Sequence, residues 1–179
     1  MGILRRATLV LIVATLSSSC GYALAGRGSF LPADIKVVGV PLLENRTPYT
    51  RLDQMITDKI RTEFIDRGKY NIRFEAAGAD AVLSGAITGL LFQAAGLTEQ
   101  QLASRQIVTV TMRLQFTDAR NGQVLWSNEA LTFREQYDLK TTANGQVDGA
   151  VLLEQEGPAF DRLSRDLARS VVTAILEAF

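Results

Sequence analysis

The segment from Gln106 to Thr117 restricts the fold more than any other, because its apolar and polar residues alternate along its length. A period of two residues is that of a β-strand with one buried and one polar face. The following stretch, 118–123, contains Asn121-Gly122, and this dipeptide favours a tight hairpin turn in which both residues take positive φ angles. Val124 to Tyr137 then predicts the returning strand, with Trp126 and Phe133 in the sheet. The apolar positions of the first strand are Ile107, Val108, Val110, Met112, Leu114 and Phe116, against Thr109, Thr111, Arg113 and Gln115.

Three other segments predict strands. Ile35 to Val40 is apolar and is stopped by Pro41, and a short strand is expected over 72–74. The long apolar run 81–94 contains Gly85 and Gly89, which allow a bend or bulge in a strand. Polar residues over 96–104 predict a loop or a short helical turn, and a further loop is expected over 139–149.

Two segments have the three- and four-residue spacing of amphipathic helices. The first is expected from Thr50 to Asp66 and is closed by Gly68, and the second from Pro158, a residue suited to the first turn, to Ala178. Their apolar stripes are Leu52, Met55, Ile56, Ile60 and Phe64, and Phe160, Leu163, Leu167, Val171, Ile175 and Leu176. Each stripe needs a surface to bury against. We therefore expect residues 35–179 to form one α+β domain, with two helices packed on one face of a mixed, largely antiparallel sheet of about four strands.

The first residues have the layout of a bacterial lipoprotein signal. Arg5 and Arg6 precede the uncharged apolar run 7–16, and three serines lead to Cys20, the only cysteine. The run is about half of the roughly 20 residues that a spanning helix needs. We expect a signal peptide over 1–19, acylation of Cys20 with fatty chains such as palmitate, and a lipid-anchored tether over 20–34. Ser17 stands where leucine is usual, and the alternatives are a buried free thiol or an ordinary secretory signal. Gly21, in place of aspartate, favours the outer membrane.

Composition excludes several chemistries. The chain has no histidine, so it cannot build a Ser-His-Asp triad or an HExxH zinc site, and a lipidated Cys20 leaves no thiol. Two carboxylate pairs, Glu154 with Glu156 and Asp58 with Glu63, could in principle serve as general acid and base. The better interpretation is that they are solvated charges on a helix or loop. The 19 basic and 19 acidic residues balance, which is not typical of a nucleic-acid binder. We expect no enzyme, no metal site and no cofactor.

Several short motifs together resemble the LPS-assembly lipoprotein (LptE) family. They are Cys20-Gly21-Tyr22, Leu31-Pro32, the strand end Val38-Gly39-Val40-Pro41 followed by Glu44-Asn45-Arg46-Thr47, and Asn121-Gly122-Gln123-Val124-Leu125-Trp126. The resemblance covers nearly the whole mature chain. It implies an outer-membrane lipoprotein on the periplasmic side that plugs the LptD β-barrel translocon, helps it assemble, and contacts lipopolysaccharide on its way to the outer leaflet.

The resemblance also suggests where lipopolysaccharide is bound. In the family, basic residues of the central hairpin loop and of the loop before the last helix have this role, but here the stretch 96–104 has no basic residue before Arg105. The candidates are Arg105, Arg113 and Lys140, whose cationic groups pair with phosphate oxygens. Two other functions stay open: activation of a cell-wall synthase in the periplasm, and a part in a secretion channel.

Overall fold

The computed structural model describes residues 31–97, 103–138 and 149–179. In chain order the elements are β1 (Val37–Gly39), β2 (Glu44–Asn45), α2 (Leu52–Asp66), β3 (Asn71–Arg73), β4 (Ala81–Leu97), β5 (Ala103–Asp118), β6 (Val124–Asp138) and α3 (Gly149–Leu176). The expected signal peptide and most of the expected tether, with Cys20, lie outside the described residues, as does most of the loop 139–149.

The strands form one mixed sheet in the order β3-β1-β4-β5-β6, with β2 also paired to β4. It has six strands, so the expectation of about four is wrong. The strand that no predicted segment covers is β2, because two residues carry too little pattern to indicate a strand. A largely antiparallel sheet is also wrong, since three of its five pairings, β1–β3, β1–β4 and β2–β4, are parallel. The physical reason is that helix α2 returns the chain between β1 and β3, and such a crossover leaves its two strands parallel.

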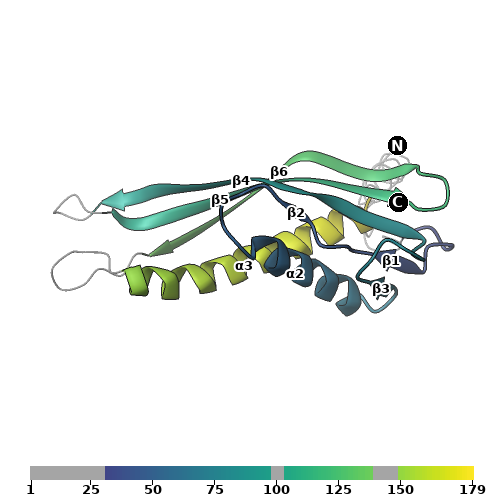
Figure 1. Cartoon of the computed structure of the whole chain (residues 1–179), viewed down its shortest axis with the longest axis horizontal. Coiled ribbons are helices and arrows are strands. Elements are labelled where there is room, and N and C mark those ends of the chain that lie inside the picture. The colour runs from purple at the N-terminus through teal and green to yellow at the C-terminus, as the bar shows by residue number, and fades with distance from the viewer. Residues whose placement is uncertain (1–30, 98–102, 139–148) are drawn as a thin grey trace, which may run out of the picture.

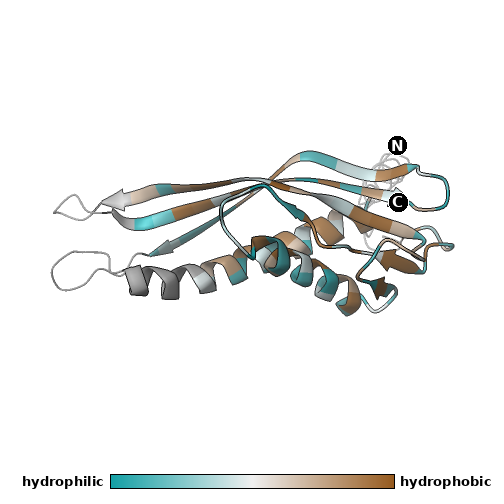
Figure 2. Ribbon diagram, viewed as in Figure 1, coloured by the Kyte–Doolittle hydropathy of each residue, from teal (hydrophilic) through white to brown (hydrophobic). Residues whose placement is uncertain are grey.

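Both helices lie on the same side of the sheet, which confirms the two-layer α+β arrangement (Figure 1). The core between the layers contains Ile56 and Phe64 of α2, Leu167 and Ile175 of α3, and the helix-facing side chains of β5. In Figure 2 the strands change along their length between hydrophobic and hydrophilic residues, as the two-residue period requires. The helix-facing residues of β5 are Val108, Val110, Met112, Leu114 and Phe116.

Helix α3 begins nine residues before the expected start at Pro158, at Gly149, and contains this proline in its interior. The start was predicted at Pro158 because proline suits the first turn of a helix. A proline can also stand inside a helix, where it removes one backbone hydrogen bond. The residues before it, such as those at 152–156, are mostly good helix formers. The helix is therefore longer than its amphipathic stripe alone predicts.

The long strands β4, β5 and β6 extend well beyond the rest of the sheet (Figure 1). β4 and β5 reach Leu97 and Ala103, so strand replaces both ends of the loop expected over 96–104. The turn after β5 is confirmed, with Asp118 N donating to the Gln123 carbonyl at 2.9 Å. Of the two turn residues expected at positive φ, only Gly122 has it, at 73°. The side chain of Asn121 instead accepts the N–H of Gln123 at 2.8 Å.

Candidate functional site

The first residues of the described chain are bound by Asp80, just before β4, and by the hairpin turn between β5 and β6. The Asp80 carboxylate accepts the backbone N–H groups of Lys36 and Val37 at 2.9 and 2.8 Å, which lowers its pKa. Arg120 donates to both carboxylate oxygens of Asp118, at 3.0 and 2.6 Å, and lowers the pKa of Asp118 to about 2. The same guanidinium pairs with Asp34 at 2.5 Å. This network fixes the point at which residues that precede the domain must enter it.

Arg105 lies at the other end of β5. It pairs in register with Asp138 of β6, and its Nε lies 3.2 Å from an Asp138 carboxylate oxygen. Both side chains are exposed, so this ion pair contributes little to stability and leaves the guanidinium accessible. At about 3.3 Å per strand residue, Arg105 is on the order of 40 Å from Asp118. The described chain thus enters at one end of the sheet and presents Arg105 at the other.

Arg113 points from the same face of β5 as Arg105, the face turned away from the helices, but eight residues along the strand. That spacing is about 26 Å, so the structure does not bring the two candidates into one cluster. Arg113 lies 3.9 Å from a Glu129 carboxylate oxygen and shares a hollow with Gly85 and Gln115. Lys140, the third candidate, lies outside the described residues.

The face of the sheet turned away from the helices is mostly polar and uncharged. It carries a further cation that the sequence analysis did not single out, Arg134, which pairs in register with Thr109 between Arg105 and Arg113. The Thr109 side-chain oxygen is buried and has no hydrogen-bond partner among the described residues. The alternation over 124–137 was the signal that could have placed Arg134 on this face. The uncharged polar residues of this sheet face include Ser84, Gln93, Thr111, Gln115, Thr117, Ser127, Thr132 and Gln136.

The carboxylates considered for acid and base chemistry are engaged in ordinary surface ion pairs where they are described. Asp58 pairs with Arg61 at 2.9 Å and Glu63 with Arg67 at 2.8 Å, each within one turn of α2. The side chains of Glu154 and Glu156 are not among those described. Within the described part of the chain, no cluster of three acidic or cysteine side chains is arranged to hold a metal ion.

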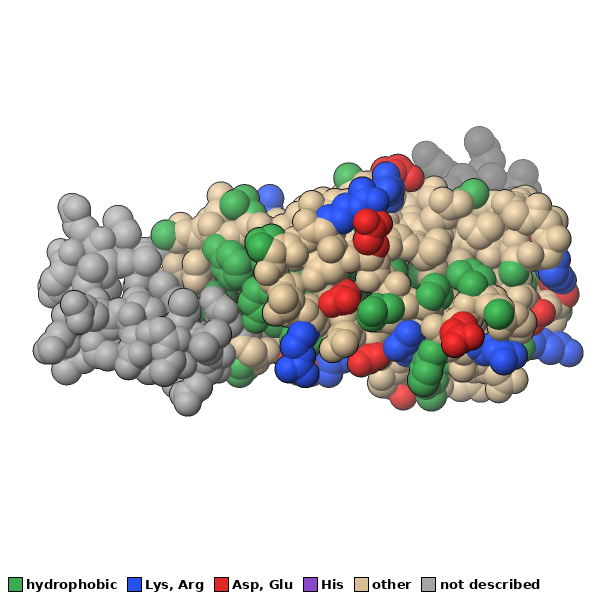
Figure 3. Space-filling view, viewed as in Figure 1, with side chains coloured by type: hydrophobic (Ala, Val, Ile, Leu, Met, Phe, Trp, Pro, Cys, Tyr) green, Lys and Arg blue, Asp and Glu red, His purple; other side chains and the backbone are tan. Residues whose placement is uncertain are grey.

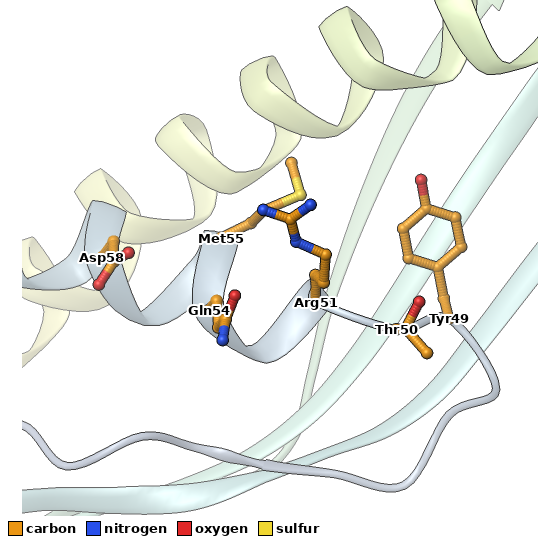
Figure 4. A pocket seen from close by; sticks show the side chains of 6 residues that line it. All are labelled: Tyr49, Thr50, Arg51, Gln54, Met55 and Asp58. Carbon is orange, nitrogen blue, oxygen red and sulfur yellow. The ribbon is translucent and has the colours of Figure 1, made fainter.

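A hollow lies beside the first turn of α2. It is lined by Tyr49, Thr50, Arg51, Gln54, Met55 and Asp58. In Figure 4, Tyr49 and Thr50 lie on the segment that leads into α2, and Gln54, Met55 and Asp58 lie on the helix itself. The ring of Tyr49 lies 4.5 Å from that of Phe160 in α3, and Phe160 lies 6.2 Å from Phe92 in β4. Phe160 is fully buried, while Tyr49 and Phe92 are half-buried. Tyr49 therefore belongs both to the lining of the hollow and to an aromatic group between the helix layer and β4.

Charges of both signs are mixed on the face seen in Figure 3, and no large patch of one sign covers it. None of the described helices is long and apolar enough to span a bilayer.

A family model described as LptE, lipopolysaccharide assembly, matches residues 35–175, which is most of the chain. No curated protein matches the sequence. Among solved structures, an uncharacterized lipoprotein B from Nitrosomonas europaea is 13% identical, with a TM-score of 0.55 over 88% of both chains. Protein XCC0632 from Xanthomonas campestris is 17% identical, with a TM-score of 0.53 over 85% of this chain and 91% of its own. Likenesses at such low identity concern the fold alone.

Proposed function

This chain belongs to the LptE family of lipopolysaccharide-assembly proteins, and from this membership we propose that it plugs and helps to assemble the LptD β-barrel and assists lipopolysaccharide transport to the outer leaflet. The match over residues 35–175 is the observation that carries the proposal, because it spans the whole sheet, helix α2 and all but the last residue of α3. In this role the protein is an outer-membrane lipoprotein held on the periplasmic side by acylated Cys20. Its role is that of a structural and binding component, without catalysis.

The shape and surface of the domain support a plug. The lumen of a transmembrane β-barrel is polar, and the sheet face turned away from the helices offers mainly hydroxyl and amide side chains to such a wall. The domain is elongated along β4, β5 and β6 (Figure 1). A barrel can enclose an elongated domain with a polar surface without burying unpaired charges.

The ends of the sheet suit two different tasks. Residues from the lipid anchor enter beside Asp34 and Arg120, so this end of the sheet is the one joined to the tether from Cys20. Arg105 is then carried to the far end, where its exposed guanidinium can pair with lipopolysaccharide phosphates. Lys140, two residues after the Asp138 partner of Arg105, belongs to the same proposed site. Arg113 is the weaker candidate because it lies within β5, eight residues from Arg105, and not at this end of the sheet.

Extraction in mild detergent tests this function. The lipidated protein is taken from its native envelope and passed through gel filtration, and the proteins that remain bound are identified. A large outer-membrane barrel in a one-to-one ratio supports the plug. A cell-wall synthase or a ring of identical subunits would refute it and favour one of the two alternatives. A Cys20→Ser variant should leave the membrane fraction, because it has no acyl chains to bury.

A further inference from the structure

One edge of β4 has no strand beside it over half of its length. Strand β2 pairs with β4 only at Ala86 and Ile87, and the Arg46 N–H donates to the Ile87 carbonyl at 3.0 Å. After Arg46 the chain turns away into α2. Among the described residues nothing pairs with this edge of β4 beyond Ile87, although β5 continues to pair with the other edge as far as Leu97.

The hydrogen-bonding direction of this edge follows from the pairing with β5. In an antiparallel pair, residues alternate between those bonded to the partner and those whose N–H and C=O groups point away. Ile87 points away from β5, since its carbonyl accepts from β2, and so does its register partner Met112 from β4. Continuing along the unbulged strand β5 assigns outward-pointing groups to Leu90, Phe92 and Ala94.

This edge lacks two of the three usual devices that prevent strand pairing. Natural edge strands are protected by charged residues, prolines or bulges placed along them. The whole of β4 contains neither a charge nor a proline. Its register shifts against β5 lie between Ile87 and Gly89 and between Ala94 and Leu97, on either side of the segment 89–94. The opposite edge strand, β6, has Arg134, Glu135 and Asp138. The segment 89–94 is therefore regular and uncharged, and an additional strand can pair with it.

The side chains along the open edge suit an apolar strand. Leu91 is 53% exposed on the outer face, and Phe92 is half-buried against Phe160 on the helix side. In Figure 3 hydrophobic side chains come to the surface between strands and helices beside the undescribed atoms. Among the described side chains of β2 and β4 and the residue after β2, charge lies only beside the β2 end of this edge, where Arg46 pairs with Glu44 at 2.8 Å. The described part of β4 thus offers no cation to a phosphate or an acidic peptide.

We propose that the β4 edge from Gly89 to Ala94 binds an extended, uncharged segment of the barrel partner as an additional strand. This inference rests on the proposed function. Main-chain hydrogen bonds supply the affinity in such strand addition, and pockets for alternate side chains supply the specificity. Barrel chains are rich in segments of alternating apolar and polar residues. Because the barrel surrounds the plug, its loops are the nearest chains to this edge.

Residue-resolved hydrogen exchange tests the proposal on the lipidated protein, free and in the purified barrel complex. In the free protein the amides of Leu90 and Phe92 should exchange fast, and those of Leu91 and Gln93, bonded to β5, slowly. In the complex, exchange at Leu90 and Phe92 should slow by at least about tenfold, since each gains a hydrogen bond. Unchanged exchange in a complex that contains the barrel overturns the strand addition but not the plug. Absence of the barrel overturns both.

Two other occupants give different results. If the amides of Leu90 and Phe92 are already protected in the free monomer, another part of this chain pairs with the β4 edge and the proposal is wrong. If protection of these amides rises with protein concentration in the absence of the barrel, a second copy of the chain pairs with the β4 edge, and the proposal is equally wrong.

A pair of proline variants provides an independent check. Ala94→Pro removes an outward N–H from an exposed position of β4, and Gln136→Pro removes one from an exposed position of β6, the edge on the other side of β5. Proline is tolerated where the N–H of an edge strand faces solvent. We expect the first variant to lower recovery of the barrel about tenfold and the second to leave it unchanged. Equal recovery with both variants would count against the edge, and the exchange experiment decides if Ala94→Pro fails to fold.

Discussion

Gly85 and Gly89 lie on the same strand, yet the structure predicts a large loss of stability when the first is replaced by alanine and little change when the second is. A Cβ atom at Gly85 would lie 2.1 Å from the Arg113 carbonyl oxygen and 2.9 Å from a methyl group of Leu114. The first of these atoms is backbone, so it cannot move without parting β4 from β5. A Cβ atom at Gly89 meets only the Thr111 side chain, at 3.5 Å, which is an ordinary contact.

The expected cost of Gly85→Ala is at least about 3 kcal/mol, the upper range for forcing an extra methyl group into a packed position. Gly89→Ala should change stability by no more than about 1 kcal/mol in either direction, because it restricts the unfolded chain without a clash. For a protein of this size, the first variant should lower Tm by about 6–12 °C. Circular dichroism of the two purified variants during heating measures this. Equal Tm values for the two variants would refute the close approach of β4 and β5 at Gly85.

Three further changes test other parts of the structure. Phe160→Ala should destabilise the domain by about 3–5 kcal/mol, because its ring is fully buried between Tyr49 and Phe92, and urea unfolding measures the loss. Asp118→Asn should be less stable than the native protein at pH 7, and the difference should vanish as pH falls toward about 2. Exchanging Arg105 and Lys140 together for glutamate should weaken binding of lipopolysaccharide, measured by co-precipitation, while the fold is retained.

The sign of the pH effect follows from the lowered pKa. A carboxyl group whose folded pKa lies below its unfolded value of about 3.9 stabilises the folded state above that value and loses this contribution as it is protonated. A difference that stays constant from pH 7 to pH 2 would therefore contradict the Arg120 pairing. For the arginine and lysine exchange, unchanged lipopolysaccharide binding removes both residues from the site. For Phe160→Ala, a loss below about 1 kcal/mol would mean that the ring is not held between its neighbours.

Local patterns predicted the parts of the fold that short-range physics controls. Of the predicted stripe from Leu52 to Phe64, all but the half-buried Met55 lie in the core, as the helical spacing requires. The alternation from Gln106 to Thr117 separates a buried face from a polar one. Gly68 ends α2 with φ at 69°. Each of these features depends on residues within one or two turns of each other, so the sequence contains the whole signal.

The site was harder to predict, because its parts are distant in the chain. Arg105 and Arg113 share a face, as their even spacing requires, but they lie too far apart for one binding cluster, and Arg134 of the next strand comes between them. Only strand pairing brings such residues together. The aromatic group of Tyr49, Phe92 and Phe160 likewise joins three elements that no local pattern connects.

By itself the sequence determined the class of the molecule: an α+β domain with two amphipathic helices, a long hairpin closed at Gly122, and motifs that resemble those of the LptE family. Tertiary structure alone decided the parallel pairing of β1 with β3 and β4, and where β2 stops beside β4. The reason is that hydrogen bonding between strands joins distant residues, and a two-residue strand has no periodicity to read. The open edge that follows Ile87 is a consequence of that pairing, and it can be seen only once the chain is folded.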